Sequence, residues 1–440
     1  MPEIIDETHA IELQSWVASA NGGACDFPIQ NLPFGVFRRA GTKETFRGGV
    51  AIGDQILDLG AALARDLFTG DAKVAAGAAS GDTLNALMAL APRYRVALRS
   101  EMSALLSEGA ARKDETTGCL VPQEDAEYAL PAAIGDFSDF YSSLHHATNV
   151  GRMFRPDNPL LPNFKWMPIG YHGRASSVVV SGHQFARPVG QIKGPDQSAP
   201  EMLPCRRLDY ELELGAFVGP GNTLGAPVAI DDAEAHVFGF CLLNDWSARD
   251  IQAWEYQPLG PFLAKSFLST ISPWVVTMEA LEPFRAAWTR PADDPQPLPH
   301  LIGATTQARG AIDIRLDVSL LTPKMKKADQ PAALLASSKF TDAYWTISQI
   351  VTHQASNGCN LQPGDLLGSG TLSGPEDGSL GCLLETSRGG SEPIKLPGGE
   401  TRTFLEDGDT VTMSAYCQRD GMARIGFGKC VGTVLPAGTN

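Results

Sequence analysis

The stretch LDYELELGAFVG, residues 208–219, decides the fold class of this chain. Acidic and apolar side chains alternate in its first half with a period of two, which predicts a β-strand. Five further stretches have strand-like composition and are separated by turn residues or short helices. They are ASSVVVSG (175–182), HVFGFCLLN (236–244), AIDIRLDVSLL (311–321), DTVTMSAYC (409–417) and RIGFGKCVGTV (424–434). The fold is therefore predicted to be mostly β with some α-helix.

The composition of the 440 residues fits a folded, turn-rich protein. Hydrophobic residues make up 43% and charged residues 19%, which excludes intrinsic disorder. The 45 glycines and 31 prolines indicate many tight turns. The net charge of −15 would repel phosphate backbones and anionic lipid surfaces. We therefore expect neither nucleic acid nor a membrane as a partner, and the excess of carboxylates leaves room for hard cations.

A small α+β domain precedes the β-rich part. Residues 47–59, RGGVAIGDQILDL, predict a hairpin, and residues 83–109 predict a helix that Pro92 divides in two. The polar stretch SEGAARKDETTGCL, residues 107–120, is the best linker. We place the domain boundary there, which gives an amino-terminal extension at 1–25, a first domain at 26–119 and a catalytic domain at 120–440.

The cysteines and the start of the chain predict a cytoplasmic protein. The eight cysteines are scattered without CxxC pairs, which fits neither a zinc site nor a redox motif. The first residues, MPEIIDETHAIELQSWVASANGG, are acidic and lack the basic and apolar regions of a signal peptide. No apolar run approaches the ~20 residues that a membrane-spanning helix needs.

The first candidate for chemistry is the acidic side of residues 208–219. Period-two geometry puts Asp209, Glu211 and Glu213 on one face of the strand. Such a pattern is most often a solvated face. The alternative is that two of the carboxylates are spaced to hold one hard cation.

A second candidate is NDWSARDIQAWEYQPLGPFLAKSF, residues 244–267. Ser247 and Asp250 resemble a capping box that opens a helix. That helix would present Arg249, Gln252 and Tyr256 on one face, where they could hold an anionic or carbonyl oxygen. An ordinary exposed helix face is the alternative.

A third candidate is DFSDFYSSLHHATNVGRMFRP, residues 136–156. Asp139 and His146 are seven positions apart, so they would share one face of a helix predicted over 138–154. A histidine in such a place is more often structural than catalytic. Glu385, in CLLETS, is a lone acid after an apolar run and has no interpretation from its surroundings alone.

These stretches closely resemble the fumarylacetoacetase family, which carries out the last step of tyrosine and phenylalanine catabolism. The resemblance is carried by DFYSSLHHATNVGRMFR, GYHGRASSVVVSG, DYELELGAFVGPGN, NDWSARDIQAWEYQPLGPFLAKSF and GCNLQPGDLLGSGTLSGPE, with DFPIQNLPFGVF and VAIGDQILDL near the start. It covers about residues 26–436 and implies a small SH3-like barrel domain followed by a mixed β-roll catalytic domain, working as a homodimer. The activity it implies is hydrolysis of a carbon–carbon bond in a 1,3-diketo acid to give fumarate and acetoacetate.

The resemblance also implies roles for particular residues. The Ca²⁺ ligands would be Asp139, Glu211, Glu213 and Asp245. Mg²⁺ would be associated with Asp245, Lys265 and Ser269, where the last position is threonine in the family. Substrate contacts would be Tyr141, Arg155, Tyr171, Gln252, Tyr256 and Thr371. The catalytic base would be His146, the second histidine of its pair, oriented by Glu385.

The residue types in these roles match the chemistry that hydrolysis of a carbon–carbon bond requires. Carbon–carbon cleavage beside a carbonyl needs an activated water, which a histidine held by a carboxylate can supply. Arg249, Gln252 and Lys265 would stabilise the tetrahedral oxyanion, and carboxylate ligands suit Ca²⁺ or Mg²⁺. The nearest rival is an acylpyruvase, hydratase or decarboxylase of the same superfamily acting on another oxo acid. A Ca²⁺-stabilised binding module would not need His146, Glu385 or Lys265, and a serine hydrolase would need a GxSxG motif, which the sequence lacks.

Overall fold

A five-stranded antiparallel sheet forms the centre of the amino-terminal domain in the computed structural model, which describes residues 5–438. Its strands are β1 (Phe34–Arg39), β2 (Arg47–Ile52), β3 (Gln55–Asp58), β4 (Leu120–Pro122) and β5 (Ala126–Ala129). They lie in the order β4-β3-β2-β1-β5, and β2 and β3 form the predicted hairpin. Both β4 and β5 follow the expected boundary at residue 119, yet they pair with β3 and β1. The first sheet therefore extends to Ala129.

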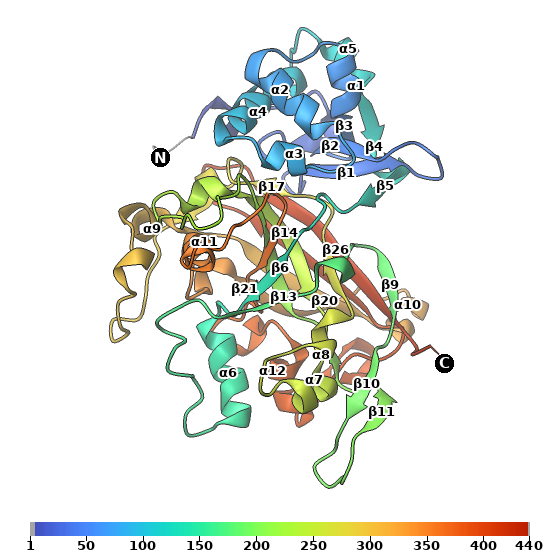
Figure 1. Cartoon of the computed structure of the whole chain (residues 1–440). Coiled ribbons are helices and arrows are strands. Elements are labelled where there is room, and N and C mark those ends of the chain that lie inside the picture. The colour runs from blue at the N-terminus through green and yellow to red at the C-terminus, as the bar shows by residue number, and fades with distance from the viewer. Residues whose placement is uncertain (1–4, 439–440) are drawn as a thin grey trace.

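Helices pack against this sheet, most of them on the side that faces away from the larger domain (Figure 1). They are α1 (Leu59–Ala64), α2 (Gly70–Ala79), α3 (Asn85–Met88), α4 (Pro92–Leu106) and α5 (Lys113–Thr117). The predicted division of the 83–109 helix is confirmed, since Pro92 begins α4 at a position where its missing N–H costs nothing. Within the segment expected to be an extension, Val17 and Ala20 are buried in the core of this domain. The Ser15 hydroxyl also donates to the Leu106 carbonyl, so this segment is tied to the end of α4.

A mixed sheet of eight strands forms the centre of the second domain. Its strands are β6 (Phe137–Phe140), β7 (Gly170–His172), β8 (Val178–Val180), β13 (Leu212–Val218), β14 (Val237–Asp245), β16 (Ser269–Ile271), β17 (Val276–Thr277) and β22 (Leu366–Gly368). The order is β7-β6-β22-β13-β14-β16-β8, with β17 also paired to β14. Every residue of β13 and β14 is buried. The alternation in 208–219 therefore does not separate a core face from a solvated face.

A second sheet packs against the first across the main core. Its strands are β9 (His183–Ala186), β20 (Arg315–Leu321), β21 (Ala333–Lys339), β25 (Thr410–Cys417) and β26 (Ile425–Leu435), in the order β21-β20-β25-β26-β9. Leu214 and Phe240 of the first sheet share one hydrophobic cluster with Leu316 and Met413 of the second. Four short pairs complete the strands: β10 (Val189–Ile192) with β11 (Glu201–Pro204), β12 (Leu208–Asp209) with β15 (Ser247–Ala248), β18 (Arg285–Ala286) with β19 (Ala311–Ile312), and β23 (Ile394–Lys395) with β24 (Thr401–Arg402). The predicted class, a small first domain followed by a β-rich domain with helices, is confirmed.

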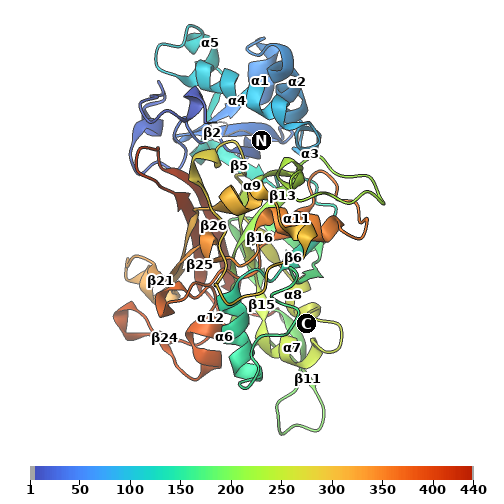
Figure 2. The same ribbon diagram turned by 90° about the vertical axis from the view of Figure 1, so that its left-hand side faces the viewer.

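Several short helices of the second domain gather at its end opposite the first domain (Figures 1 and 2). These are α6 (Leu144–Phe154), α7 (Arg249–Glu255), α8 (Leu263–Ser266) and α12 (Leu383–Thr386). The remaining helices are α9 (Ala304–Arg309), α10 (Pro323–Lys327) and α11 (Ile347–Ala355).

Two local predictions in this region are wrong. The helix expected over 138–154 begins only at Leu144, because Asp139 belongs to β6 and Ser143 caps the helix by accepting from the His146 N–H. Asp139 and His146 therefore do not share a helix face. Ser247 does not cap α7 either, because it lies in β15 and its hydroxyl donates to the Asp245 carbonyl.

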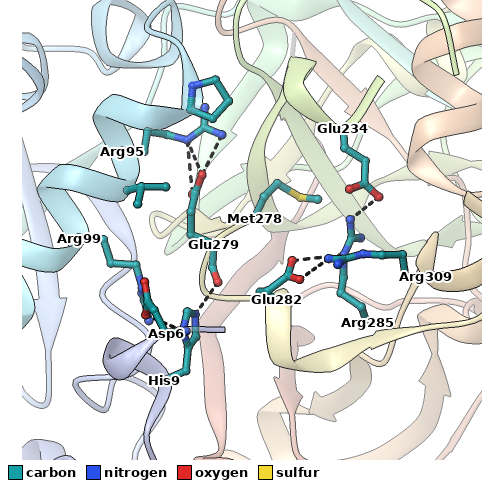
Figure 3. Close-up of a pocket in the computed structure, with 12 residues that line it drawn as sticks. Asp6, His9, Arg95, Arg99, Glu234, Met278, Glu279, Glu282, Arg285 and Arg309 are labelled. Carbon is teal, nitrogen blue, oxygen red and sulfur yellow. Dashed lines mark hydrogen bonds and ion pairs between the residues drawn. The ribbon is translucent and has the colours of Figure 1, made fainter. Parts of the chain in front are cut away.

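A network of arginine and acidic side chains joins the two domains (Figure 3). Arg95 Nε of α4 donates to Glu279 Oε1 over 3.1 Å, and His9 Nε2 lies 2.9 Å from the Glu279 carbonyl oxygen. The network continues with ion pairs from Arg285 to Glu234 and from Arg309 to Glu282. These side chains line a cavity of about 70 Å³ where α4 meets the segment after β17.

The helices and the cysteines can be compared with the sequence predictions about membranes and disulfides. Within residues 5–438, no helix combines the length and the apolar character that crossing a membrane requires. All eight cysteines are free thiols.

Candidate active site

A cavity of about 460 Å³ opens among β6, β7, α6, α7 and α8. Its volume lies in the range of small-molecule sites. All six residues expected to contact substrate line it, namely Tyr141, Arg155, Tyr171, Gln252, Tyr256 and Thr371. They come from segments that are far apart in the sequence and that the folding of the central sheet brings together.

His146 and Glu385 form a buried pair at one wall of this cavity. His146 Nδ1 lies 2.7 Å from Glu385 Oε2, and the side chains are 4% and 0% exposed. His146 is on the first turn of α6 and lines the cavity, whereas Glu385 is on α12 behind it. Because an ionised carboxylate only accepts hydrogen bonds, it assigns the proton of the neutral imidazole to Nδ1. The lone pair is then on Nε2.

Three neutral side chains hold the Glu385 carboxylate. Asn149 Nδ2 donates to Oε1 over 2.9 Å, and Ser373 Oγ and Cys382 Sγ donate to Oε2 over 2.8 and 3.2 Å. Burial alone would raise the pKa of Glu385, but His146, Asn149 and Ser373 outweigh it and lower the pKa to about 2. Glu385 is therefore ionised at every physiological pH.

Four buried carboxylates form a second group beside the pair. Asp139, Glu211, Glu213 and Asp245 each offer an oxygen, and these oxygens lie within 4.8 Å of one another. Burial, followed by repulsion from the neighbouring carboxylates, raises the pKa of Asp139 and of Glu213 well above the ordinary values. Glu213 Oε1 is buried without a hydrogen-bond partner among the described residues. An all-oxygen group of this kind, with unrelieved repulsion and an unpartnered acceptor, fits a hard divalent cation.

Gly370 closes this group from the backbone side. Its N–H donates to Asp139 Oδ1 over 3.1 Å and to Glu213 Oε2 over 3.2 Å. The residue has a φ of 72°, and a Cβ there would lie 1.9 Å from the Phe140 carbonyl oxygen. Only glycine can therefore bring its N–H to both carboxylates at this turn.

Two cations balance part of the acidic charge. Lys265 Nζ donates to Glu211 Oε2 and, over 2.7 Å, to Asp245 Oδ2. Arg249 Nη1 lies 2.8 Å from Glu211 Oε1. Burial favours the neutral acid, but Lys265 and Arg249 outweigh it and lower the pKa of Glu211 to about 2. Asp245 also accepts from Tyr171 and Ser269, over 2.7 and 2.8 Å.

The structure thus brings together every residue that the sequence suggested for the site. Arg249, Gln252 and Lys265 line the cavity together with His146. Sequence reasoning assigned no role to Asn149, Ser373 and Cys382. Asn149 lies three positions after His146, which is a usable signal once the helix is known. No comparable signal exists for Ser373 and Cys382, because their contact with Glu385 depends on tertiary folding.

Comparisons with known proteins cover nearly the whole chain. The family profile described as fumarylacetoacetate (FAA) hydrolase C-terminal matches residues 137–435, and the one described as fumarylacetoacetase N-terminal matches residues 30–131. Curated fumarylacetoacetases from Bos taurus and Homo sapiens are each 51% identical, over 94% of this chain and 97% of theirs. The one from Oryza sativa is 48% identical over 97% of this chain and 98% of its own.

A solved structure of a fumarylacetoacetate hydrolase from Exiguobacterium antarcticum aligns with a TM-score of 0.49 and 16% identity, over 92% of this chain and 99% of that chain. The two profiles account for both domains, and the curated relatives match at about half of the positions over nearly the full length. The chain belongs to the fumarylacetoacetate hydrolase family.

Proposed function

We propose that this protein is a fumarylacetoacetase, which hydrolyses a carbon–carbon bond of fumarylacetoacetate to give fumarate and acetoacetate. The observation that carries the proposal is the buried His146–Glu385 pair, 2.7 Å apart, at the wall of a cavity that also contains an acidic group and two buried cations. The name shared by the curated relatives supports the choice of substrate.

His146 takes the proton from the attacking water. Its Nε2 lone pair is the free acceptor, since Nδ1 is engaged with Glu385. The carboxylate fixes the tautomer and stabilises the imidazolium that forms, without itself taking the proton. The tetrahedral intermediate then collapses with cleavage of the carbon–carbon bond, which releases fumarate and leaves acetoacetate as its enolate. The same imidazolium returns the proton to the enolate carbon and so completes acetoacetate.

Lys265, Arg249 and Gln252 stabilise the tetrahedral oxyanion. Both cations are held in fixed positions by Glu211, so they need little reorganisation when charge develops on the substrate. Gln252 Oε1 accepts from Arg249 Nη1 over 3.2 Å. Its amide N–H groups are then available to a substrate oxygen.

Asp139, Glu211, Glu213 and Asp245 would hold the divalent cation, for which we propose Ca²⁺. When bound, such an ion polarises the diketone oxygens as a Lewis acid. For Mg²⁺, the available oxygens are those of Asp245 and Ser269. Lys265 contributes an ammonium that already donates to Glu211 and Asp245, so it would lie beside the ion as a charged neighbour and not as a ligand.

We also propose a homodimer in a reducing compartment, the cytoplasm. The family resemblance supports the dimer, and eight free cysteines are consistent with the compartment. Sedimentation equilibrium would give about twice the chain mass of 46.9 kDa for the dimer and the chain mass itself for a monomer.

The substrate assignment is tested by following loss of diketone absorbance and identifying the products. We expect fumarylacetoacetate to be hydrolysed to fumarate and acetoacetate with a kcat/KM far above that for acylpyruvates, and chelation to remove the activity. A preference for acylpyruvates, or decarboxylation without cleavage into two acids, would favour the related oxo-acid enzymes instead.

A further inference from the structure

The four arginine and lysine side chains that line the active-site cavity fall into two pairs. Arg249 and Lys265 are deeply buried and already neutralised. Arg249 Nη2 lies 2.9 Å from Asp209 Oδ2 and Nη1 lies 2.8 Å from Glu211, while Lys265 is paired with Glu211 and Asp245. Ion pairs with the protein's own carboxylates already compensate both positive charges. Neither side chain is therefore an efficient partner for a full carboxylate on a ligand.

Arg155 and Arg207 are different, because neither is within ion-pair distance of a carboxylate in residues 5–438. Arg155 Nη2 donates only to the Pro159 carbonyl, over 3.3 Å. Arg207 Nη2 donates to the Gly389 carbonyl over 2.6 Å, and its guanidinium lies 4.9 Å from the centre of the Phe404 ring. Both residues line the cavity. Two guanidinium groups without a counter-charge at a ligand cavity favour the binding of an anionic ligand.

Arg207 is also held more firmly than an ordinary surface arginine. One edge of its guanidinium is fixed by the Gly389 carbonyl, and one face packs on Phe404. Its own carbonyl accepts from the Arg249 N–H at the start of α7, over 3.0 Å. The remaining N–H donors are therefore pre-oriented, which lowers the entropy cost of a bidentate contact with a carboxylate.

We infer that Arg207 is a second carboxylate anchor, which binds one end of a dicarboxylate substrate while Arg155 binds the other. The inference rests on the proposed function and extends it to a residue without an assigned role in that site. Fumarylacetoacetate carries a carboxylate at each end of its carbon chain, whereas an acylpyruvate with an apolar acyl group, such as acetylpyruvate, carries only one. A cavity with two unpaired arginines matches the first kind of substrate, so Arg207 is a specificity-determining residue.

The test compares Arg207→Gln with Arg206→Gln, in the full-length enzyme. Arg206 is the adjacent residue, is exposed and does not line the cavity, so its replacement removes the same charge from nearly the same place. Dissociation constants for fumarate and for acetoacetate are measured by calorimetry, together with KM and kcat for fumarylacetoacetate. Arg207→Lys and a thermal melt of each variant separate lost recognition from lost folding.

We expect Arg207→Gln to weaken binding of one product, and to raise KM, by roughly 10- to 100-fold, the effect of one charge-assisted contact. Arg155→Gln should weaken the other product, Arg207→Lys should recover part of the loss, and Arg206→Gln should match the parent. The inference is overturned if Arg207→Gln binds both products like the parent, or if it weakens both equally. Absence of turnover in the parent would instead contradict the proposed function, and the product-binding measurements would still decide the role of Arg207.

Discussion

At the scale of single residues, Asp245 belongs both to the surroundings of Lys265 and to the four-carboxylate group. Its two oxygens accept from Lys265, Tyr171 and Ser269, and it also belongs to the four-carboxylate group. Removing it would leave the Lys265 ammonium with one partner and the cation with one ligand fewer. The loss of a Lys265 partner and the loss of a cation ligand would both lower the rate of hydrolysis.

We therefore predict that Asp245→Ala abolishes turnover and weakens divalent-cation binding. The measurements are kcat on fumarylacetoacetate and the bound metal content after dialysis against a limiting cation concentration. A variant with near-normal activity and unchanged metal content would remove Asp245 from the site.

Glu385 should make a measurable contribution to acid stability. Its pKa of about 2 lies below the ordinary value of 4.5, so its ionised form stabilises the folded state. The contribution, about 3 kcal/mol, is complete above pH ~4.5 and is lost as the pH falls toward 2.

The matching experiment is urea unfolding of the parent and of Glu385→Gln at a series of acidic pH values. We expect the free energy of unfolding to fall more steeply with decreasing pH in the parent, because only the parent takes up this proton on unfolding. Parallel curves for the two proteins would mean that Glu385 is not held in its ionised form.

At the scale of elements, the period-two pattern of 208–219 predicted one strand, whereas the structure has two, β12 and β13, with Tyr210 and Glu211 between them. The pattern also could not say which carboxylates meet. Asp209 accepts from the Leu383 and Leu384 N–H groups and pairs with Arg249. Glu211 and Glu213 instead meet Asp139 and Asp245. The difference depends on what other strands and helices place opposite each side chain, and that information is not local.

The segment 136–156 is a second case in which local sequence did not determine the structure. One helix was expected over 138–154, but Phe137–Phe140 pairs with β22 and β7, and tertiary pairing overrides the local preference. Asp139 and His146 still line one cavity, though for a reason that the helix prediction did not contain. Glu385 was uninterpretable locally, because its partner His146 is 239 positions away.

The prediction at this scale concerns Glu213 of β13 and Glu211, which lies immediately before that strand. Replacing Glu211 and Glu213 together with Gln should remove the stabilisation by Ca²⁺, since two of the four cation ligands lose their charge. For the parent, a Ca²⁺ concentration about 100 times the dissociation constant should add about 2.7 kcal/mol. Thermal melts with and without Ca²⁺ measure this difference.

Stability that still rises with Ca²⁺ in the double variant, as it does in the parent, would show that the cation binds elsewhere. The Arg207→Gln variant serves as a control, because it alters the cavity without touching the four carboxylates.

At the scale of the whole molecule, the domain interface and the active site lie at opposite ends of the larger domain (Figures 1 and 2). The interface depends on buried charge, since the Arg95 and Glu279 side chains are 2% and 13% exposed. Removing one member of a buried pair leaves the other charge without compensation, at a cost of about 3–5 kcal/mol.

We predict that Glu279→Ala lowers thermal stability by about that amount while leaving KM for fumarylacetoacetate unchanged. Asp71→Ala is the matched control, because its pair with Arg93 is exposed and should contribute nothing measurable. Calorimetric melting and steady-state kinetics provide the two readouts. A Glu279→Ala protein as stable as the parent would mean that the ion-pair network does not stabilise the contact between the two domains.

The central claim is that His146, held by Glu385, is the base that activates water, and its neighbour offers the sharpest comparison. His145 is half-buried on the same helix turn, whereas Glu385 is hydrogen-bonded to His146. The measurement is kcat on fumarylacetoacetate for His146→Ala, His145→Ala and the His146→Ala/Glu385→Gln double variant. We predict a loss of ~10²–10⁴-fold for His146→Ala, little change for His145→Ala, and a double variant no worse than His146→Ala alone. A His146→Ala enzyme with nearly full kcat, or a loss matched by His145→Ala, would contradict the account.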